Sequence, residues 1–284
     1  MDSGNIGFVL LCAAFVFVMT PGLAMFYGGL VRKKNVVNTM MTSIFIIGVG
    51  IVMWVLFGYS LSFAPSGNAF IGDFRWLGLE GVSLTEGYTD DASIPNMVFS
   101  AFQMMFAVIT PALITGAVAG RMKFKSIFVF TIFWSLIVYY PLAHMVWGQG
   151  GLLGADGIGA LDFAGGDVVH ISSGVSALVL CILLGKRHDY EHSIYRIHNI
   201  PTVVLGASLL MFGWFGFNAG SALAADGLAA HAFMTTGVSA AAAMLSWMLC
   251  DVIKNKKPTL IGASTGMVAG LVGITPGAGF VPMW

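Results

Sequence analysis

The chain has 284 residues, of which 57% are hydrophobic and only 9% are charged, and its formal net charge at pH 7 is zero. This composition is typical of a protein with several membrane-spanning segments and excludes an ordinary water-soluble domain. The balance of 13 basic and 13 acidic residues gives no indication of a nucleic-acid partner.

Eight apolar stretches are each long enough to cross a hydrocarbon layer of about 30 Å as a helix. In chain order they cover about 6–28, 39–63, 94–119, 126–145, 163–184, 202–221, 232–253 and 259–275. The first stretch follows Asp2, has no basic residues before it and has no small-residue cleavage site, so we expect a retained helix and not a signal peptide. The sequence therefore predicts an all-α polytopic membrane protein with about eight transmembrane helices.

Basic residues occur in every second loop between these stretches. The loops concerned contain Arg32, Lys33, Lys34, Arg121, Lys123, Lys125, Lys186, Arg187, Arg196, Lys254, Lys256 and Lys257. Of the 13 basic residues only Arg75 lies elsewhere, in a loop that is otherwise acidic. Because short loops rich in Lys and Arg stay in the cytoplasm, we expect a multi-pass protein of the cell membrane with its N-terminus outside.

Two outer segments interrupt the helical pattern. Residues 64–93 contain Gly, Pro and acidic residues, which predicts an ordered or semi-ordered outer loop. Residues 147–161 are so rich in Gly that we expect non-helical backbone at the membrane surface, where protein or a watery cavity covers it. Several stretches also carry Gly at four-residue spacing, as at Gly216 and Gly220, a pattern that predicts close helix packing.

No motif for enzyme catalysis occurs in the sequence. A phosphate-binding loop, an HExxH pair, a GxSxG elbow and a CxxC pair are all absent, so we predict no enzyme activity and no cofactor. The three cysteines lie at different depths, which indicates neither a disulfide nor a metal cluster. His188, His192 and His198, with Asp189 and Glu191 between the first two, form only a weak metal pattern, and we expect a solvated loop there.

Asp162 and His170 are ionisable residues at the start of and within an apolar membrane-spanning stretch, where such groups cost free energy. If a helix begins just after Asp162, its carboxylate caps the N–H groups of Ala164 and Gly165. The functional alternative is that this charge also draws cations into an outer vestibule, for which Asp167 is a further candidate. With a rise of about 1.5 Å per residue, His170 would lie roughly 12 Å further in, near the middle of the membrane.

A polar residue at that depth is a candidate for a functional site. A neutral imidazole in a dry passage can accept a hydrogen bond from a small polar solute. The structural alternative is a buried histidine bonded to a neighbouring helix. The two histidines at the outer ends of their stretches, His144 and His231, are assigned to structure.

Aromatic residues suggest either core packing or a cation site. Phe102 and Phe106 are four residues apart and share a helix face, as do Phe217 and Ser221. Trp147 lies at the outer end of its stretch, where Trp is common in interfacial belts. Together with a hydroxyl and a carboxylate, these rings could also form an aromatic cage for a small cation.

Four strings carry a resemblance to a known family. They are GGLVRKKN at 28–35, PLAHMVWG at 141–148, DFAGGDVVHIS at 162–172 and WFGFNAGS at 214–221. In these strings the chain resembles the ammonium transporter (Amt/Rh) family. The resemblance implies a homotrimer of eleven-helix protomers, each with its own narrow channel and built from two inverted repeats.

By similarity, Phe106, Trp147 and Ser221 would form the outer ammonium-binding site. The rings and the hydroxyl there would replace the hydration of the cation.

The resemblance also implies roles further along the pore. Phe106 and Phe217 would stack as a gate, with Phe102 beside them, and His170 would be the first of two pore histidines. Asp162 would be the structural carboxylate that supports the outer site.

The sequence departs from the family pattern in two places. The position of Asp167 more often holds a small neutral or hydroxyl residue. The chain also stops at Trp284, before the family's last three helices and its second pore histidine. We therefore expect residues 1–185 to form the first five-helix repeat and residues 199–284 an incomplete second repeat, so that the chain is a truncated product or fragment.

The predicted function is transport of ammonium or ammonia, with methylammonium as an analogue, from an outer aromatic site through a hydrophobic pore that contains histidine. Two alternatives are an ammonium-sensing membrane domain and a truncated, non-conducting fragment. A proton-coupled carrier is disfavoured because the stretches lack multiple acidic relay groups. A regulatory protein of the PII type at the cytoplasmic face is a candidate partner, besides the lipid bilayer.

Overall fold

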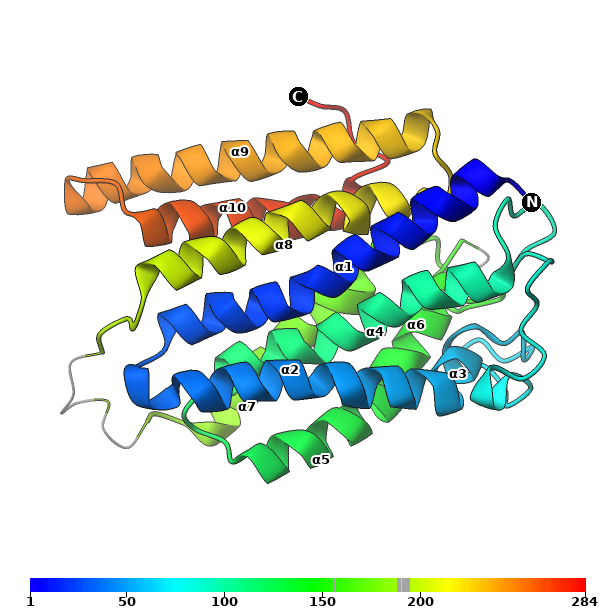
Figure 1. The fold of residues 1–284 in the computed structure, drawn as a ribbon, viewed down its shortest axis with the longest axis horizontal. Helices are drawn as coiled ribbons and strands as arrows, with labels where there is room; N and C mark the ends of the chain where they lie inside the picture. The colour runs from blue at the N-terminus through cyan, green and yellow to red at the C-terminus, as the bar shows by residue number, and fades with distance from the viewer. Residues whose placement is uncertain (156, 188–189, 191–194) are drawn as a thin grey trace.

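The computed structural model describes residues 1–155, 157–187, 190 and 195–284. Eight helical segments of this part are long and apolar enough to cross a membrane, as predicted. They are Ser3–Leu30, Lys33–Phe63, Asn96–Val118, Phe124–Trp147, Gly166–Leu184, Ile200–Gly220, Gly227–Asn255 and Leu260–Gly277. Figure 1 shows them side by side in one bundle, without a strand among the described residues.

Ten α-helices make up these segments. They are α1 (Ser3–Leu30), α2 (Val36–Met53), α3 (Tyr59–Phe63), α4 (Asn96–Val118), α5 (Phe124–Trp134), α6 (Tyr140–Trp147), α7 (Ser172–Leu184), α8 (Ile200–Gly220), α9 (Gly227–Asn255) and α10 (Leu260–Ile274). Three segments contain a wider, π-helical turn, at η2 (Trp54–Gly58), η4 (Ser135–Tyr139) and η5 (Gly166–Ile171). Each π-helical turn leads directly into an α-helix, so α3, α6 and α7 are the C-terminal parts of three longer helical segments.

The loops sort to the two ends of the bundle. In Figure 1 the α1–α2, α4–α5 and α9–α10 connections lie at one end, while the N-terminus and the long α3–α4 connection lie at the other. The basic loops therefore share one end. Which end faces the cytoplasm stays a prediction from their charge.

Helices α1 and α8 pack closely because glycines lie between them. A methyl group added at Gly206 would lie 2.3 Å from the backbone nitrogen of Phe26, and one at Gly29 would lie 2.6 Å from Cγ2 of Val203. The predicted packing role of the small-residue stripes is seen at Gly216 and Gly220 as well, where the added carbon would meet Cys12 of α1. This contact joins the first and sixth spanning segments along their length (Figure 1).

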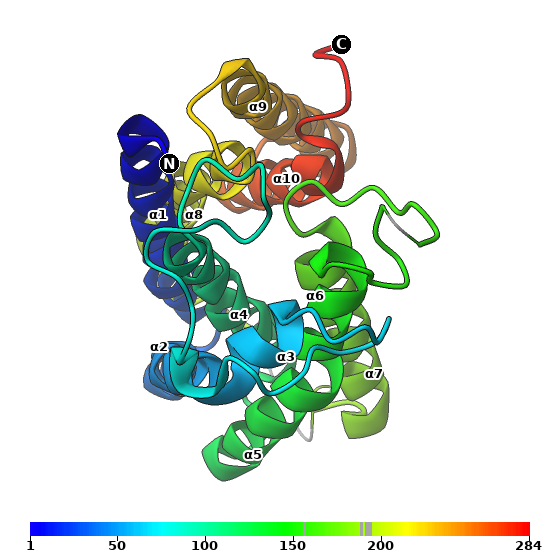
Figure 2. The same cartoon turned by 90° about the vertical axis from the view of Figure 1, so that its right-hand side faces the viewer.

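The two outer segments have the character predicted for them. After α6 the glycine-rich backbone is not helical and folds back, so that the N–H groups of Leu153 and Gly154 both donate to the carbonyl of Met145. The α3–α4 connection is ordered over its described length by an aromatic cluster, in which Tyr88 stacks on Phe99 with ring centroids 4.8 Å apart. Figure 2 looks onto this end of the bundle, where both segments lie.

Candidate functional site

The fifth spanning segment begins at a backbone site built by Asp162. Its carboxylate is buried, and Oδ1 accepts the N–H groups of Gly165 and Gly166, each at 2.6 Å. Oδ2 accepts those of Asp167 at 2.7 Å and Val168 at 3.1 Å. Four donors at a helix start, which have no partner within the helix, are thereby satisfied.

The predicted start of this helix is wrong by three residues. The helix begins at Gly166, not directly after Asp162, because Gly165 has a φ of +121° that a helix does not allow. The carboxylate therefore caps Gly165 as expected but not Ala164, and the N–H of Phe163 donates to the carbonyl of Pro276 instead. His170 lies four residues beyond the first helical residue, inside the π-helical turn, and is therefore nearer to the helix start than the roughly 12 Å that the sequence suggested.

The His170 ring is held by stacking. It lies nearly parallel to the Phe217 ring, at 5.9 Å and 12°, and also contacts Trp214 at 5.4 Å. Its Nε2 is buried and has no hydrogen-bond partner among the described residues. Within the described residues, His170 is therefore not hydrogen-bonded through Nε2 to a neighbouring helix, as the structural alternative had it.

The phenylalanines predicted as a gate lie together beside this histidine. Phe106 contacts Phe217 with ring centroids 4.3 Å apart, and Phe102 contacts Phe106 at 4.9 Å. All three rings are buried. Because Phe217 touches both Phe106 and His170, three rings follow one another in a continuous stack.

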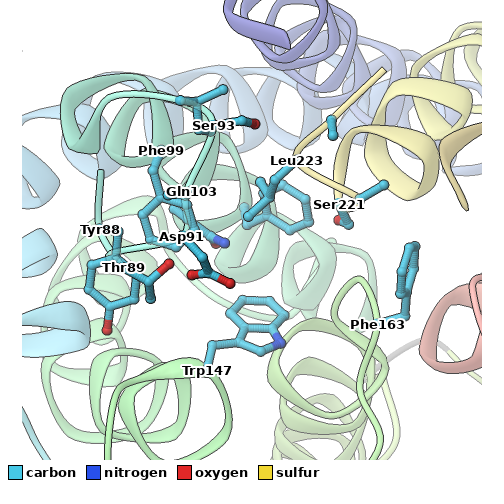
Figure 3. Close-up of a pocket in the computed structure, with 15 residues that line it drawn as sticks. Tyr88, Thr89, Asp91, Ser93, Phe99, Gln103, Trp147, Phe163, Ser221 and Leu223 are labelled. Atoms are coloured by element: carbon cyan, nitrogen blue, oxygen red, sulfur yellow. The ribbon is translucent and has the colours of Figure 1, made fainter. Parts of the chain in front are cut away.

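A cavity of about 440 Å³ borders this stack at the end of the bundle that carries the α3–α4 connection, and we call it the outer cavity after the predicted orientation (Figure 3). Phe106, Trp147 and Ser221, which the sequence placed on three different segments, all line it. The rest of the lining comes from the α3–α4 connection, from Phe99 and Gln103 of α4, from Phe163 and from the segment that follows Ser221.

Trp147 and Ser221 are held in place by hydrogen bonds to backbone carbonyls. Trp147 stands edge-on to Phe106 at 6.0 Å, and its Nε1 donates to the carbonyl of Asp162 at 3.1 Å. The Ser221 hydroxyl donates to the carbonyl of Phe217 at 2.9 Å, which leaves its oxygen free to accept an N–H. Aromatic faces and an accepting hydroxyl are the groups that bind an ammonium-type cation.

Three further lining residues were not singled out from the sequence. Tyr88 accepts the backbone N–H of Gln149 at 3.1 Å, and burial raises the pKa of Tyr88 to about 12, so its phenol is neutral at pH 7. Gln103 has a buried Oε1 without a partner in the described structure, and Asp91 brings a carboxylate. The spacing of Gln103 from Phe106 on one helix face could have identified it, whereas the loop residues gave no such periodicity.

A second cavity, of about 510 Å³, lies on the other side of the ring stack. It is lined by His170, Ser173 and Ala177 of the fifth segment and by residues of α1 and α4, among them Tyr27 and Leu113. Phe106 lines the outer cavity and His170 the inner one, with Phe217 between them.

The other histidines lie outside both cavities where they are described. His144 is buried, with Nδ1 at 3.1 Å from the carbonyl of Ser62 and Nε2 at 2.8 Å from that of Asn68, and Nε2 of His231 is 2.9 Å from the carbonyl of Val281. These bonds agree with the structural assignment.

The remaining ionisable candidates do not form a site in the described chain. Of the loop with the weak metal pattern, positions 188–189 and 191–194, including His188, Asp189, Glu191 and His192, lie outside the described residues. Within the described part no group of three metal-binding side chains occurs. Asp167 does not line the outer cavity.

Comparison with known proteins places this arrangement in a family. Residues 7–284 match the sequence profile described as the Ammonium Transporter Family. The chain is 53% identical to an ammonium transporter of Bacillus subtilis over 281 residues, which cover 99% of this chain and 68% of that protein. Among solved structures it is similar to Mep2 of Saccharomyces cerevisiae, with a TM-score of 0.90 and 39% identity, over 100% of this chain and 63% of the other.

A second solved structure, titled a sensor Amt protein, matches with a TM-score of 0.87 and 28% identity, covering 99% of this chain and 70% of that one. The chain thus spans about two thirds of the length of the proteins that it resembles. The family profile and the identity to the Bacillus protein lead to one conclusion: the chain belongs to the ammonium transporter family.

Proposed function

We propose that this chain carries the ammonium-binding site and part of the pore of a transporter that moves ammonium or ammonia across the cell membrane. The observation that carries the proposal is the continuous stack of Phe106, Phe217 and His170 between an outer and an inner cavity. The proposed cation site thus borders a buried apolar stack of rings. Membership of the ammonium transporter family gives the same substrate.

In this proposal the outer cavity binds the cation, and the ring stack below it excludes ions. Trp147, Phe106 and Ser221 bind ammonium in the outer cavity through ring faces and the hydroxyl oxygen. The buried rings below exclude a hydrated ion, because a charge there would have no compensating water. The ammonium therefore gives up its proton to solvent water in the outer cavity, above the stack, and neutral ammonia passes toward His170.

Uptake of radiolabelled methylammonium into proteoliposomes tests this proposal. We expect Trp147→Leu to raise the half-saturation concentration severalfold, because the cation loses a ring face. The matched control is Trp247→Leu, since Trp247 is 41% exposed on α9 and lines neither cavity. Uptake by Trp147→Leu with the wild-type half-saturation concentration would contradict the proposed site.

A second candidate function is ammonium sensing. It is favoured by the likeness to the structure titled a sensor Amt protein, since the same outer cavity could serve a receptor. The two functions differ in flux. Equilibrium binding of methylammonium without any saturable uptake into liposomes would favour the sensor, whereas uptake that saturates at the binding concentration favours the transporter.

The assembly and the partners are part of the same proposal. We infer a homotrimer in the cell membrane, with residues 1–185 as one five-helix repeat and 199–284 belonging to a second. The end of the bundle that carries the basic loops would be the face for a PII-type regulator. Cross-linking of the detergent-solubilised protein tests the trimer, and co-purification tests the regulator.

A further inference from the structure

The wall of the outer cavity contains one carboxylate that the proposed ammonium site does not use. Asp91 is the only acidic residue, and there is no basic one, among the described residues that line this cavity. Figure 3 shows its carboxylate turned into the cavity toward the Trp147 ring. The side chain is exposed and accepts no hydrogen bond from the described residues.

No other described residue of the lining supplies this charge. The Asp162 carboxylate is buried under four backbone N–H groups and is not part of the lining. Tyr88 is neutral at pH 7, for the reason given above. In the α3–α4 connection, Asp73 binds Arg75 at 2.7 Å, and neither residue lines the cavity.

The position of Asp91 is fixed by the backbone around it. The N–H of Ala92 donates to the carbonyl of Thr89 at 3.1 Å, which closes a turn through Asp91. Just beyond the turn, the carbonyl of Ser93 accepts the N–H of Asp2 at 2.8 Å, so the start of α1 holds the loop.

The same helix start also holds the opposite rim of the cavity. The Asn5 amide donates to the Ser93 hydroxyl at 2.9 Å, and its oxygen accepts the N–H of Ala225 at 2.9 Å. Asn5 thus ties the loop that carries Asp91 to the segment that follows Ser221. The carboxylate is therefore held over the aromatic site and is not part of a free surface loop.

We propose that Asp91 recruits the monovalent cation to the outer aromatic site by its negative charge, a role that rests on the ammonium-binding function proposed above. Contacts with ring faces and a hydroxyl act only at short range, whereas a carboxylate attracts cations over the screening length, about 10 Å at 0.1 M salt. A charge of one sign in a cleft raises the local concentration of the counter-ion there. Asp91 is thus a positioning and specificity residue that favours a cation over neutral amines.

The test compares Asp91→Asn with Asp90→Asn in methylammonium uptake by the full chain in proteoliposomes. Asp90 is the neighbouring exposed carboxylate and is not part of the lining. At low ionic strength we expect Asp91→Asn to raise the half-saturation concentration about threefold at an unchanged maximal rate, as one charge acting through water at close range would do. Asp90→Asn should have a smaller effect, because its carboxylate is not part of the lining, and Asp91→Glu should retain most of the wild-type affinity.

Salt separates this electrostatic role from a structural one. In about 1 M sodium chloride, where the screening length falls to about 3 Å, the difference between Asp91→Asn and the wild type should vanish. A salt-independent difference, an equal effect of Asp90→Asn, or no difference at low ionic strength would each overturn the proposal. If the wild type shows no saturable uptake, the transport function fails, and equilibrium binding of methylammonium by the same variants then decides the role of Asp91.

Discussion

At the residue scale, the main role of the Asp162 carboxylate is to accept hydrogen bonds from four backbone N–H groups. They come from consecutive residues, Gly165 to Val168, and all lie at the start of the fifth segment. The Asp162 carbonyl in turn accepts Trp147 Nε1, so the start of this helix also orients a ring of the outer cavity. One residue therefore links the stability of a helix to the geometry of the site.

We predict that Asp162→Asn destabilises the protein by about 2 to 6 kcal/mol, because the amide nitrogen cannot accept the two N–H groups now bound by Oδ2, and each buried unpaired donor costs about 1 to 3 kcal/mol. The measurement is the free energy of unfolding of the purified protein in mixed detergent micelles. The control is Asp167→Asn, since the Asp167 side chain accepts no hydrogen bond from the described residues and is only partly buried. Equal destabilisation by both variants would show that charge near the helix start matters, and not the acceptor geometry.

Replacing His170 should change transport, whereas replacing His144 should lower stability. His170→Ala takes away a ring of the stack that borders the inner cavity, so we expect altered methylammonium flux or altered discrimination against potassium. His144→Ala takes away contacts to two backbone carbonyls and should cost about 1 to 3 kcal/mol of stability, with a normal rate per folded protein. Unchanged methylammonium and potassium fluxes in His170→Ala would argue against a pore role for this residue.

At the scale of the elements, the contact between α1 and α8 sets how close the two halves of the bundle can come. Gly206 faces the backbone of α1 directly, and backbone atoms cannot move aside as a flexible side chain can. Small residues at such contacts are the usual means by which membrane helices approach one another. The ring stack spans α4 and α8, so its spacing depends on this packing.

We predict that Gly206→Ala destabilises the protein by about 1 to 3 kcal/mol, the usual cost of overpacking, because the new methyl group would lie 2.3 Å from the Phe26 nitrogen. Gly48→Ala is the matched control, since Gly48 lies in α2 and an added methyl group there meets no atom within 4 Å. This control should be neutral or stabilising by up to about 1 kcal/mol, because Ala is the better helix former. Thermal unfolding in detergent, followed by the loss of the monodisperse peak, measures both.

The spanning segments could be predicted from the sequence because each needs only a long apolar run, whatever packs against it. The start of the fifth segment could not, because it depends on Gly165 adopting a positive φ and on Pro276, more than 100 residues away, accepting the Phe163 N–H. The π-helical turns leave no pattern in composition at all. In the site, residues with helical spacing or a family motif could be identified, whereas Tyr88 and Asp91 reach the cavity from a loop whose path is fixed by Asp2 and Gln149.

At the scale of the whole molecule, two helices leave apolar side chains uncovered. Within an apolar stretch of 18 residues in each segment, the share of buried residues is 22% in Gly166–Leu184 and 11% in Gly227–Asn255, against 72% in Asn96–Val118. On the first of these, Ile182 and Leu183 are 70% and 76% exposed. Lipid or further protein has to cover such faces, since exposed apolar patches of this kind do not persist in water.

The charge at the two ends of the bundle predicts how the molecule sits in the membrane. The α9–α10 connection carries Lys256 and Lys257, while the α3–α4 connection at the other end carries Glu80 among its acidic residues. Because basic loops are retained in the cytoplasm, we expect the second end and the N-terminus to be outside. The outer cavity, which the α3–α4 connection lines, then faces the source of ammonium.

Single cysteines test this orientation. In a chain with Cys12, Cys181 and Cys250 replaced by alanine, Glu80→Cys should react with a membrane-impermeant maleimide in intact cells, because Glu80 is exposed in the outer connection. Lys257→Cys, equally exposed at the other end, should react only after the cells are permeabilised. The opposite pattern would place the aromatic cavity in the cytoplasm, and the site that recruits ammonium would then serve export. Labelling at both positions in intact cells would mean that the chain inserts in two orientations and that the loop charges do not determine its topology.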